Sequence, residues 1–298
     1  MTAAGVVYPV TDAALHHTSP IMIATLRALA GGALLTLMLP LMRSRLPRTR
    51  RLWGWAFAIG FGNTTLTQVG ISVGTDRAGA AVAAVLLNSS PFFVAVIARF
   101  ALGEAITRLR AAGLVIGFGG VLLVVFSDPG NIAHGSRLAI GFALALLGAL
   151  GWAGGGLGMR VLTLREPNLD IPGITAAQFL MGGVPLIPLA LLAGGTTDWG
   201  RTTLDLQLAY LVLGGQVLVY LGFNAALSSW PSTRVYAWTF LVPAVAVVIE
   251  AFQGQLPGFA ATVGVALVIL GVAIVNHPHA EQHAVEAAEL PLIAETRS

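Results

Sequence analysis

The sequence predicts an all-α membrane protein with ten transmembrane helices, arranged as two inverted five-helix repeats. Of the 298 residues, 56% are hydrophobic and only 10% are charged, whereas soluble domains carry about 25% charged residues. This composition cannot build a water-facing surface, so most of the surface must face lipid. The number of helices follows from apolar stretches close to the roughly 20 residues that cross a bilayer. The stretches are 1–15, 19–42, 52–73, 77–101, 107–126, 138–158, 171–194, 204–226, 232–252 and 257–276.

Loop residues separate these stretches, as in SDPGNIAHGS (127–136) and GGTTDWGRTT (194–203), where Gly, Pro and Asp interrupt helices. Residues 277–298 are polar, and we expect them to form a cytoplasmic tail. We do not interpret its histidine pattern HPHAEQH (277–283) as a metal site. The chain has no Cys, so disulfides and thiol chemistry are excluded, and no metal or other cofactor is expected.

Arginine predicts the orientation, because cytoplasmic loops carry the excess of positive charge. Eleven arginines lie in one alternate set of loops and in the tail, and three lie in the opposite set. Both termini are therefore predicted to be cytoplasmic, with the protein in the bacterial inner membrane. The densest group is Arg43, Arg45, Arg48, Arg50 and Arg51. We interpret it as a topology signal, with binding of anionic lipid or of a partner as the alternative; nucleic-acid binding is not indicated.

The two halves of the chain match each other. When Pro91 is aligned with Pro243 and one deletion is allowed, Gly113 matches Gly264. SPIMIATLRALAGG (19–32) likewise matches IPGITAAQFLMGG (171–183). We therefore predict one five-helix repeat over 1–126 and a second over 138–276. Because five is odd, the second copy is inserted upside down, an arrangement typical of secondary transporters with a substrate site near the midplane.

At this point the sequence resembles the EamA branch of the drug/metabolite transporter superfamily. The residues that carry the resemblance are the Ser-Pro and Arg of 19–27, NSSPFFVAVIARFALGE (88–104), and the spaced glycines of 113–120 and 264–271. The resemblance implies a secondary transporter, often an exporter of amino acids or other small metabolites, and we favour the aromatic and neutral amino-acid exporters. It also implies a Trp-Gly or Trp-Ala dipeptide in each of the first and sixth helices. Only Trp152-Ala153 is present, so we expect the first helix to be truncated at its N-terminus.

A polar stripe predicts the substrate site. Gln216, Tyr220 and Asn224 are four residues apart in an apolar stretch, so in a helix they share one face. Polar atoms are costly in lipid, so we expect this face to look into the bundle. The other candidates are Asn63, Thr67, Asn88, Trp152, Tyr236 and Phe240. Amides and rings together suit a zwitterion with an apolar side chain; the alternative is that these residues hydrogen-bond neighbouring helices.

Charges within the apolar stretches are few. Arg27 could hold a substrate carboxylate or pair with Asp12. Asp12 and Glu250 are candidates for a coupling proton or other ion. Glu104 is interpreted as a helix cap or loop tie. Pro91 and Pro243, at matching positions in the two halves, are candidate hinges.

We therefore expect a secondary active transporter that exports neutral or aromatic amino acids by alternating access. Its expected partners are a small-molecule substrate and the lipid bilayer, with coupling to a proton or other ion left open. An exporter of a drug, nucleoside or organic anion stays open, as does a channel or scaffold. An enzyme is not expected, because no HExxH zinc motif occurs.

Overall fold

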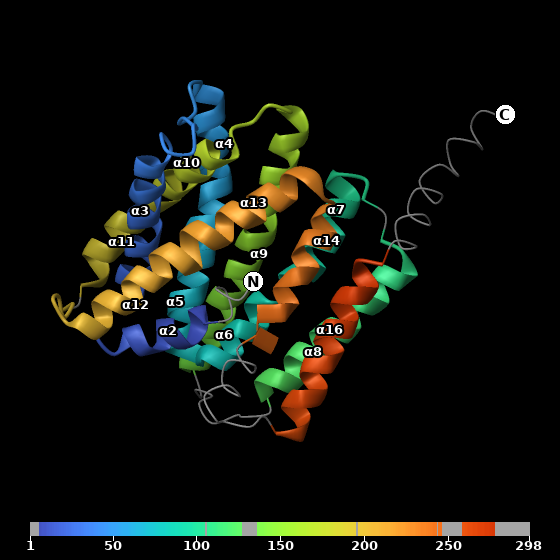
Figure 1. The fold of residues 1–298 in the computed structure, drawn as a ribbon. Coiled ribbons are helices and arrows are strands. Elements are labelled where there is room, and N and C mark those ends of the chain that lie inside the picture. The colour runs from blue at the N-terminus through green and yellow to red at the C-terminus, as the bar shows by residue number, and fades with distance from the viewer. Residues whose placement is uncertain are drawn as a thin grey trace.

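The computed structural model describes residues 6–104, 106–126, 136–194, 196–242, 244–245 and 258–277, and all secondary structure there is helical (Figure 1). The chain runs through α2 (Val7–Leu15), α3 (Pro20–Met38), α4 (Arg50–Gly60), η1 (Phe61–Leu66), α5 (Thr67–Ala78), α6 (Ala80–Leu87), α7 (Ser90–Ala101), α8 (Arg108–Phe126), α9 (Ser136–Arg165), α10 (Ile171–Gly183), α11 (Leu186–Ala193), α12 (Thr202–Val212), η2 (Leu213–Leu218), α13 (Val219–Ser229), α14 (Ser232–Ala237), η3 (Trp238–Phe240) and α16 (Phe259–Val275).

The helices have the length and composition of membrane spans. Among the described residues, six helical runs are long and apolar enough to cross a bilayer, and α16 is a shorter apolar helix. Large apolar side chains face outward, as at Leu41 (84% exposed), Phe100 (86%) and Leu192 (84%), where lipid would surround them. The prediction of an all-helical membrane protein is confirmed to this extent. The arrangement of ten spans in two inverted repeats stays a prediction.

Two helices continue at least five residues beyond the predicted stretches. The third stretch was expected to end at residue 73, yet α5 continues to Ala78. The chain then turns at Gly79 alone, whose φ of 91° lies in a region that only glycine enters readily. The sixth stretch was expected over 138–158, whereas α9 continues to Arg165. Apolarity marks the part of a helix in lipid, and a helix can extend beyond it with its charged side chains in water.

Two π-helical segments lie at equivalent places in the two halves. η1 begins eleven residues after the start of α4, and η2 begins eleven residues after the start of α12. A π segment replaces i→i+4 hydrogen bonds with i→i+5 bonds, and such segments are frequent at functional sites. Asn63 lies in η1 and Gln216 lies in η2, so one polar candidate of each span sits on a widened turn.

The fourth span is broken beside one of the candidate hinges. α6 ends at Leu87 and α7 begins at Ser90, with Pro91 in its first turn. Proline has no N–H to donate to the Leu87 carbonyl, and the backbone bonds here contract to i→i+3, from Ser89 N to Leu86 O at 3.1 Å. The corresponding span changes to the 3₁₀ segment η3 just before residue 243. Pro243 itself lies outside the described residues.

Glycines let α8 and α16 pack along their length, and the two helices lie side by side in Figure 1. A Cβ at Gly120 would meet the Gly264 carbonyl oxygen at 2.6 Å, and one at Gly264 would meet the Gly120 carbonyl oxygen at 2.8 Å. Between helices in lipid, such close backbone approach supplies the van der Waals contact that holds them together.

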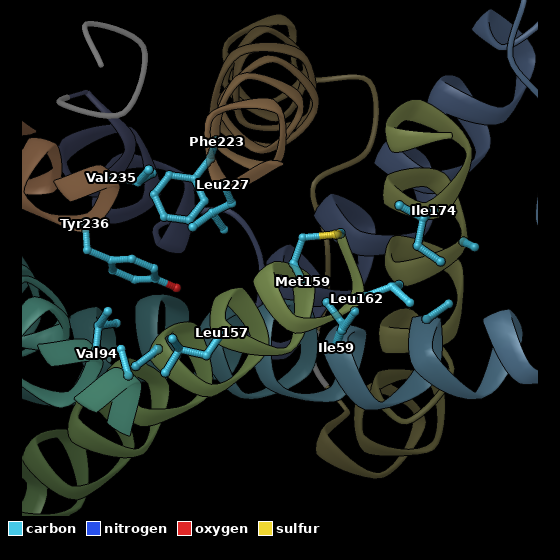
Figure 2. Packing of buried hydrophobic residues seen from close by; sticks show 14 residues of the cluster. Ile59, Val94, Leu157, Met159, Leu162, Ile174, Phe223, Leu227, Val235 and Tyr236 are labelled. Carbon is cyan, nitrogen blue, oxygen red and sulfur yellow. The ribbon is translucent and has the colours of Figure 1, made fainter. Parts of the chain in front are cut away.

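A buried apolar cluster joins α9 to helices of both halves. Figure 2 shows Leu157, Met159 and Leu162 of α9 between Val94 of α7, Ile59 of α4, and Phe223 and Tyr236 of the second half. The Tyr236 ring lies over α9. This cluster fixes one wall of the cavity described next.

Candidate functional site

A cavity of about 90 Å³ lies between helices of the two halves. Its lining is mostly apolar with a few polar groups, the usual character of a small-molecule site. The lining residues are Val7, Tyr8, Arg27, Thr67, Ile71, Leu87, Asn88, Ser90, Trp152, Gly215, Val219, Tyr220, Phe223, Thr239 and Val242. We call this the central cavity. Five of the sequence candidates meet there: Arg27, Thr67, Asn88, Trp152 and Tyr220.

Arg27 supplies a positive charge to the central cavity. It lies midway along α3 and is 1% exposed. Its Nη2 donates a hydrogen bond to the Gly215 carbonyl of η2 at 3.3 Å, while its Nε and Nη1 have no hydrogen-bond partner among the described residues. The distance is long for an N–H···O bond, whose usual value is about 2.9–3.0 Å. The guanidinium is therefore buried, charged and only weakly satisfied by the protein.

Asp12 does not neutralise Arg27. Both residues are described, Asp12 is exposed, and no ion pair joins them. Of the two interpretations of Arg27, the ion pair with Asp12 is therefore contradicted by the structure. Glu250, the other acidic candidate, lies outside the described residues.

An aromatic wall forms one side of the central cavity. It consists of Trp152, Tyr220 and Phe223, with Tyr236 packed behind them, and the sequence places these four residues on three different spans. The Trp152 ring lies 5.0 Å from that of Tyr220, 4.6 Å from that of Phe223 and 5.9 Å from that of Tyr236, centroid to centroid. The Tyr236 hydroxyl donates to the Trp152 carbonyl, and Tyr236 itself supports the wall without lining the cavity.

Two polar candidates line the central cavity in fixed positions. The Thr67 hydroxyl donates to the Gly62 carbonyl at 3.0 Å and lies 3.3 Å from the Gly148 carbonyl. The Asn88 amide nitrogen donates to the Ala84 carbonyl at 2.7 Å and caps the broken turn before Pro91. These bonds hold both side chains at the cavity edge, so a substrate would meet a preformed polar rim.

The structure divides the polar stripe of α13 and η2. Tyr220 lines the cavity and donates its hydroxyl to the Asn63 carbonyl at 2.6 Å. Gln216 instead accepts a hydrogen bond from the Gln68 amide. Asn224 donates to the Thr175 hydroxyl at 2.9 Å. Gln216 and Asn224 are therefore held by neighbouring helices, and of the three residues only Tyr220 lines the cavity.

The remaining candidates lie near the cavity without lining it. Asn63 is fully buried in η1, and its amide has no hydrogen-bond partner. Phe240 belongs to a separate apolar cluster, where its ring packs against Gly117 and Phe118. Neither side chain faces the cavity in this conformation.

The sequence reasoning missed three polar lining residues: Tyr8, Ser90 and Thr239. Ser90 adjoins Asn88 and Pro91, so the break in the fourth span could have marked it. Thr239 follows Tyr236 by three residues and could have been placed on the same helical face. For Tyr8 no signal was available, because an isolated tyrosine in an apolar stretch is common in membrane helices.

A serine-hydrolase pattern is present but in the wrong setting. Residues 70–74 read GISVG and match G-x-S-x-G, which in hydrolases forms a sharp turn from a strand into a helix. Here Ser72 lies in the middle of α5 and is fully buried. The helical setting removes the strained turn that would expose the serine as a nucleophile.

Comparison with known proteins gives a consistent assignment. The EamA-like transporter family model matches residues 1–126 and 139–277. An uncharacterized transporter of Synechocystis sp. is 29% identical over 242 residues, covering 77% of this chain and 72% of the relative. A probable amino-acid metabolite efflux pump of Salmonella typhimurium is 26% identical over 248 residues, covering 81% and 80%. A solved crystal structure, 16% identical, superposes with a TM-score of 0.76 over 92% of this chain and 94% of that one, which shows the fold alone.

Proposed function

The chain belongs to the EamA-like transporter family, and on that premise we propose that it exports small carboxylate-bearing solutes, with neutral or aromatic amino acids as its substrates. Transport proceeds by alternating access across the inner membrane, with the central cavity as the binding site. The name of the Salmonella relative, an amino-acid metabolite efflux pump, supports the substrate class.

One observation carries the proposal: the buried guanidinium of Arg27 faces the cavity with two nitrogens that have no hydrogen-bond partner among the described residues. Leaving a buried charge unpaired is costly, and a carboxylate is the group that an arginine binds best through paired hydrogen bonds. The aromatic wall stands in the same cavity as Arg27. A solute with a carboxylate at one end and an apolar or aromatic side chain at the other fits both features.

The small size of the cavity favours an occluded conformation. Ligand sites usually measure about 300–1,000 Å³, against about 90 Å³ here. The cavity must therefore widen to admit an amino acid, as alternating access requires. The two π segments and the broken span beside Pro91 are places where the helices can bend with little loss of regular hydrogen bonding.

Ties between the halves close the molecule at both ends. At one end the Thr18 and Thr197 hydroxyls lie 2.8 Å apart, and His17 lies 3.4 Å from Asp198. At the other end the Glu104 carboxylate accepts from the Ser232 and Thr233 backbone N–H groups, at 2.9 and 3.2 Å. We assign the first end to the periplasm and the second to the cytoplasm. Breaking the periplasmic contacts while the cytoplasmic contacts stay formed gives the state open to the periplasm, and the reverse gives the state open to the cytoplasm.

Counterflow in proteoliposomes tests the proposal. Vesicles containing the full chain are loaded with a mixture of unlabelled amino acids, uridine and an organic anion, and uptake of labelled phenylalanine, leucine, threonine, glutamate, lysine, uridine and the organic anion is measured. We expect saturable exchange of neutral and aromatic amino acids. Tyr220→Ala, which opens the aromatic wall, should abolish exchange, while Gly222→Ala on the outer side of the same helix, where an added methyl group meets nothing within 4 Å, should leave it intact.

The other outcomes separate the alternatives. Exchange of uridine without amino acids, or of organic anions that lack an ammonium group, would replace the amino-acid assignment. Flux that does not saturate and shows no counterflow would indicate a channel and contradict alternating access.

A further inference from the structure

A second hollow, of about 420 Å³, lies at the end of the molecule assigned to the cytoplasm, far along α3 from the central cavity. One side is the loop between α3 and α4, and the other is the loop between α9 and α10. We call it the basic pocket and define it by Arg43, Arg45, Arg48, Glu166 and Asp170, which line it together with apolar residues of both loops.

Both loops are tied in place around the basic pocket. The Arg45 backbone N–H donates to the Asp170 carboxylate at 2.8 Å, and the Trp53 indole donates to the Pro47 carbonyl at 2.9 Å. Arg43 adopts a φ of 55°, a region that non-glycine residues enter rarely. The pocket is thus a built feature and not a gap between loose loops.

The acidic groups of the pocket are already engaged, whereas the arginines are not. The Glu166 carboxylate pairs with Arg51 at 2.8 Å. The Asp170 carboxylate caps α10 through the Gly173 N–H at 2.9 Å and also holds the Arg45 backbone. Among the described residues, the exposed guanidinium groups of Arg43, Arg45 and Arg48 have no hydrogen-bond or ion-pair partner. The pocket therefore offers three unpaired positive charges.

The pocket lies at the depth of lipid head groups. Leu37 near the end of α3 and Leu41 in the turn that follows it are 78% and 84% exposed and belong in the hydrocarbon region. Arg43 follows two residues later, so the charges begin where the apolar surface ends. Trp53 closes the same loop, and tryptophan is enriched at this interface.

We propose that the basic pocket binds the phosphate of an anionic phospholipid of the adjoining leaflet. A topology signal requires only positive charge in the loop. It does not require three arginines to converge on one hollow whose acids are occupied. Arginine matches a phosphate through its planar fork of donors, and basic pockets beside membrane helices are suited to anionic head groups. A lipid held there would bridge the loops that flank α3 and α10, one helix from each half.

Lipid titration of the full chain in detergent tests the assignment. Native mass spectrometry counts bound phosphatidylglycerol, phosphatidylcholine or inorganic phosphate, and the unfolding temperature is followed in parallel. We expect phosphatidylglycerol to bind and to raise the unfolding temperature, with phosphatidylcholine and inorganic phosphate much weaker. The triple variant R43Q/R45Q/R48Q should lose at least about tenfold in affinity for phosphatidylglycerol.

Two matched variants separate recognition from charge and topology. R50Q/R99Q/R108Q removes the same charge from exposed arginines that do not line the pocket, and it should keep its affinity. R43K/R45K/R48K keeps the topology signal but loses the planar forks, and it should bind phosphatidylglycerol several-fold more weakly while inserting normally. Equal binding of phosphatidylglycerol and phosphatidylcholine, equal binding of inorganic phosphate, or full affinity in the Gln variant would each overturn the proposal.

Discussion

Replacing Arg27 with Met tests the central claim of the site most directly. Methionine has a similar length and fills the space without charge. Because the structure gives this arginine only one long hydrogen bond, we expect the empty protein to tolerate the change. We expect binding of a carboxylate substrate to fall sharply, because its main partner is lost.

The size of each effect follows from the geometry. A hydrogen bond to a charged group contributes about 1.5–3 kcal/mol. Two such bonds from the unsatisfied nitrogens of Arg27 to a carboxylate, discounted for the substrate's lost hydration, amount to about 2–4 kcal/mol. That corresponds to about 30- to 700-fold in Kd. In the empty protein, the lost bond to Gly215 is offset by removal of a desolvated charge, so the unfolding temperature should not fall.

The assay pairs the protein change with a substrate change. Competition against counterflow is measured for phenylalanine and for phenylalaninamide, which lacks the carboxylate charge, in the native chain and in Arg27→Met. The native chain should prefer the acid by the factor given above, and the variant should treat acid and amide alike. This design isolates the interaction between guanidinium and carboxylate from any general damage.

A different pattern would refute the reasoning. If Arg27→Met unfolds at a much lower temperature, yet the folded fraction still prefers the acid over the amide, Arg27 is a structural tie to η2. The substrate carboxylate would then have to be held elsewhere, and the assignment of the cavity would lose its main support.

Three further predictions concern packing and gating. Gly120→Ala should destabilise the protein by about 1–3 kcal/mol in reversible unfolding, because a methyl group there meets backbone of α16, whereas Gly119→Ala should be neutral, since nothing lies within 4 Å of it. Gly156→Ala should displace the hydroxyl of Tyr236 behind the aromatic wall and so weaken substrate binding. Gly154→Ala should not weaken binding, because its added methyl group meets nothing within 4 Å. Glu104→Ala should remove the tie to the start of α14 and increase thiol labelling of cavity cysteines from the cytoplasm, a measurement that the natural absence of Cys makes clean.

Each of these has a contrary result. Equal stability of the two variants in α8 would show that the α8–α16 contact relaxes at no cost. Unchanged binding in Gly156→Ala would separate the aromatic wall from substrate recognition. Thiol labelling that rises equally from both sides in Glu104→Ala would indicate local unfolding in place of gating.

The amino-acid sequence by itself determined the class of protein and identified five of the residues that line the cavity. Its composition allows only a membrane protein, because so few charged residues cannot cover a surface in water. Arg27, Thr67, Asn88, Trp152 and Tyr220 were identifiable because polar or aromatic groups in apolar stretches are costly unless they have a partner. The structure brings these five together at one cavity.

Only the tertiary structure decided which face of each helix meets which neighbour. Regular spacing placed Gln216, Tyr220 and Asn224 on one face, and all three side chains are buried. Helix packing places Gln216 in a hydrogen bond with Gln68 and Asn224 in one with Thr175, whereas Tyr220 lines the cavity. That no acid among the described residues forms an ion pair with Arg27 was likewise decided in three dimensions. Local spacing determines which side of a regular helix a side chain projects from. The residue that it meets there comes from a distant part of the chain, so the sequence of the helix does not identify it.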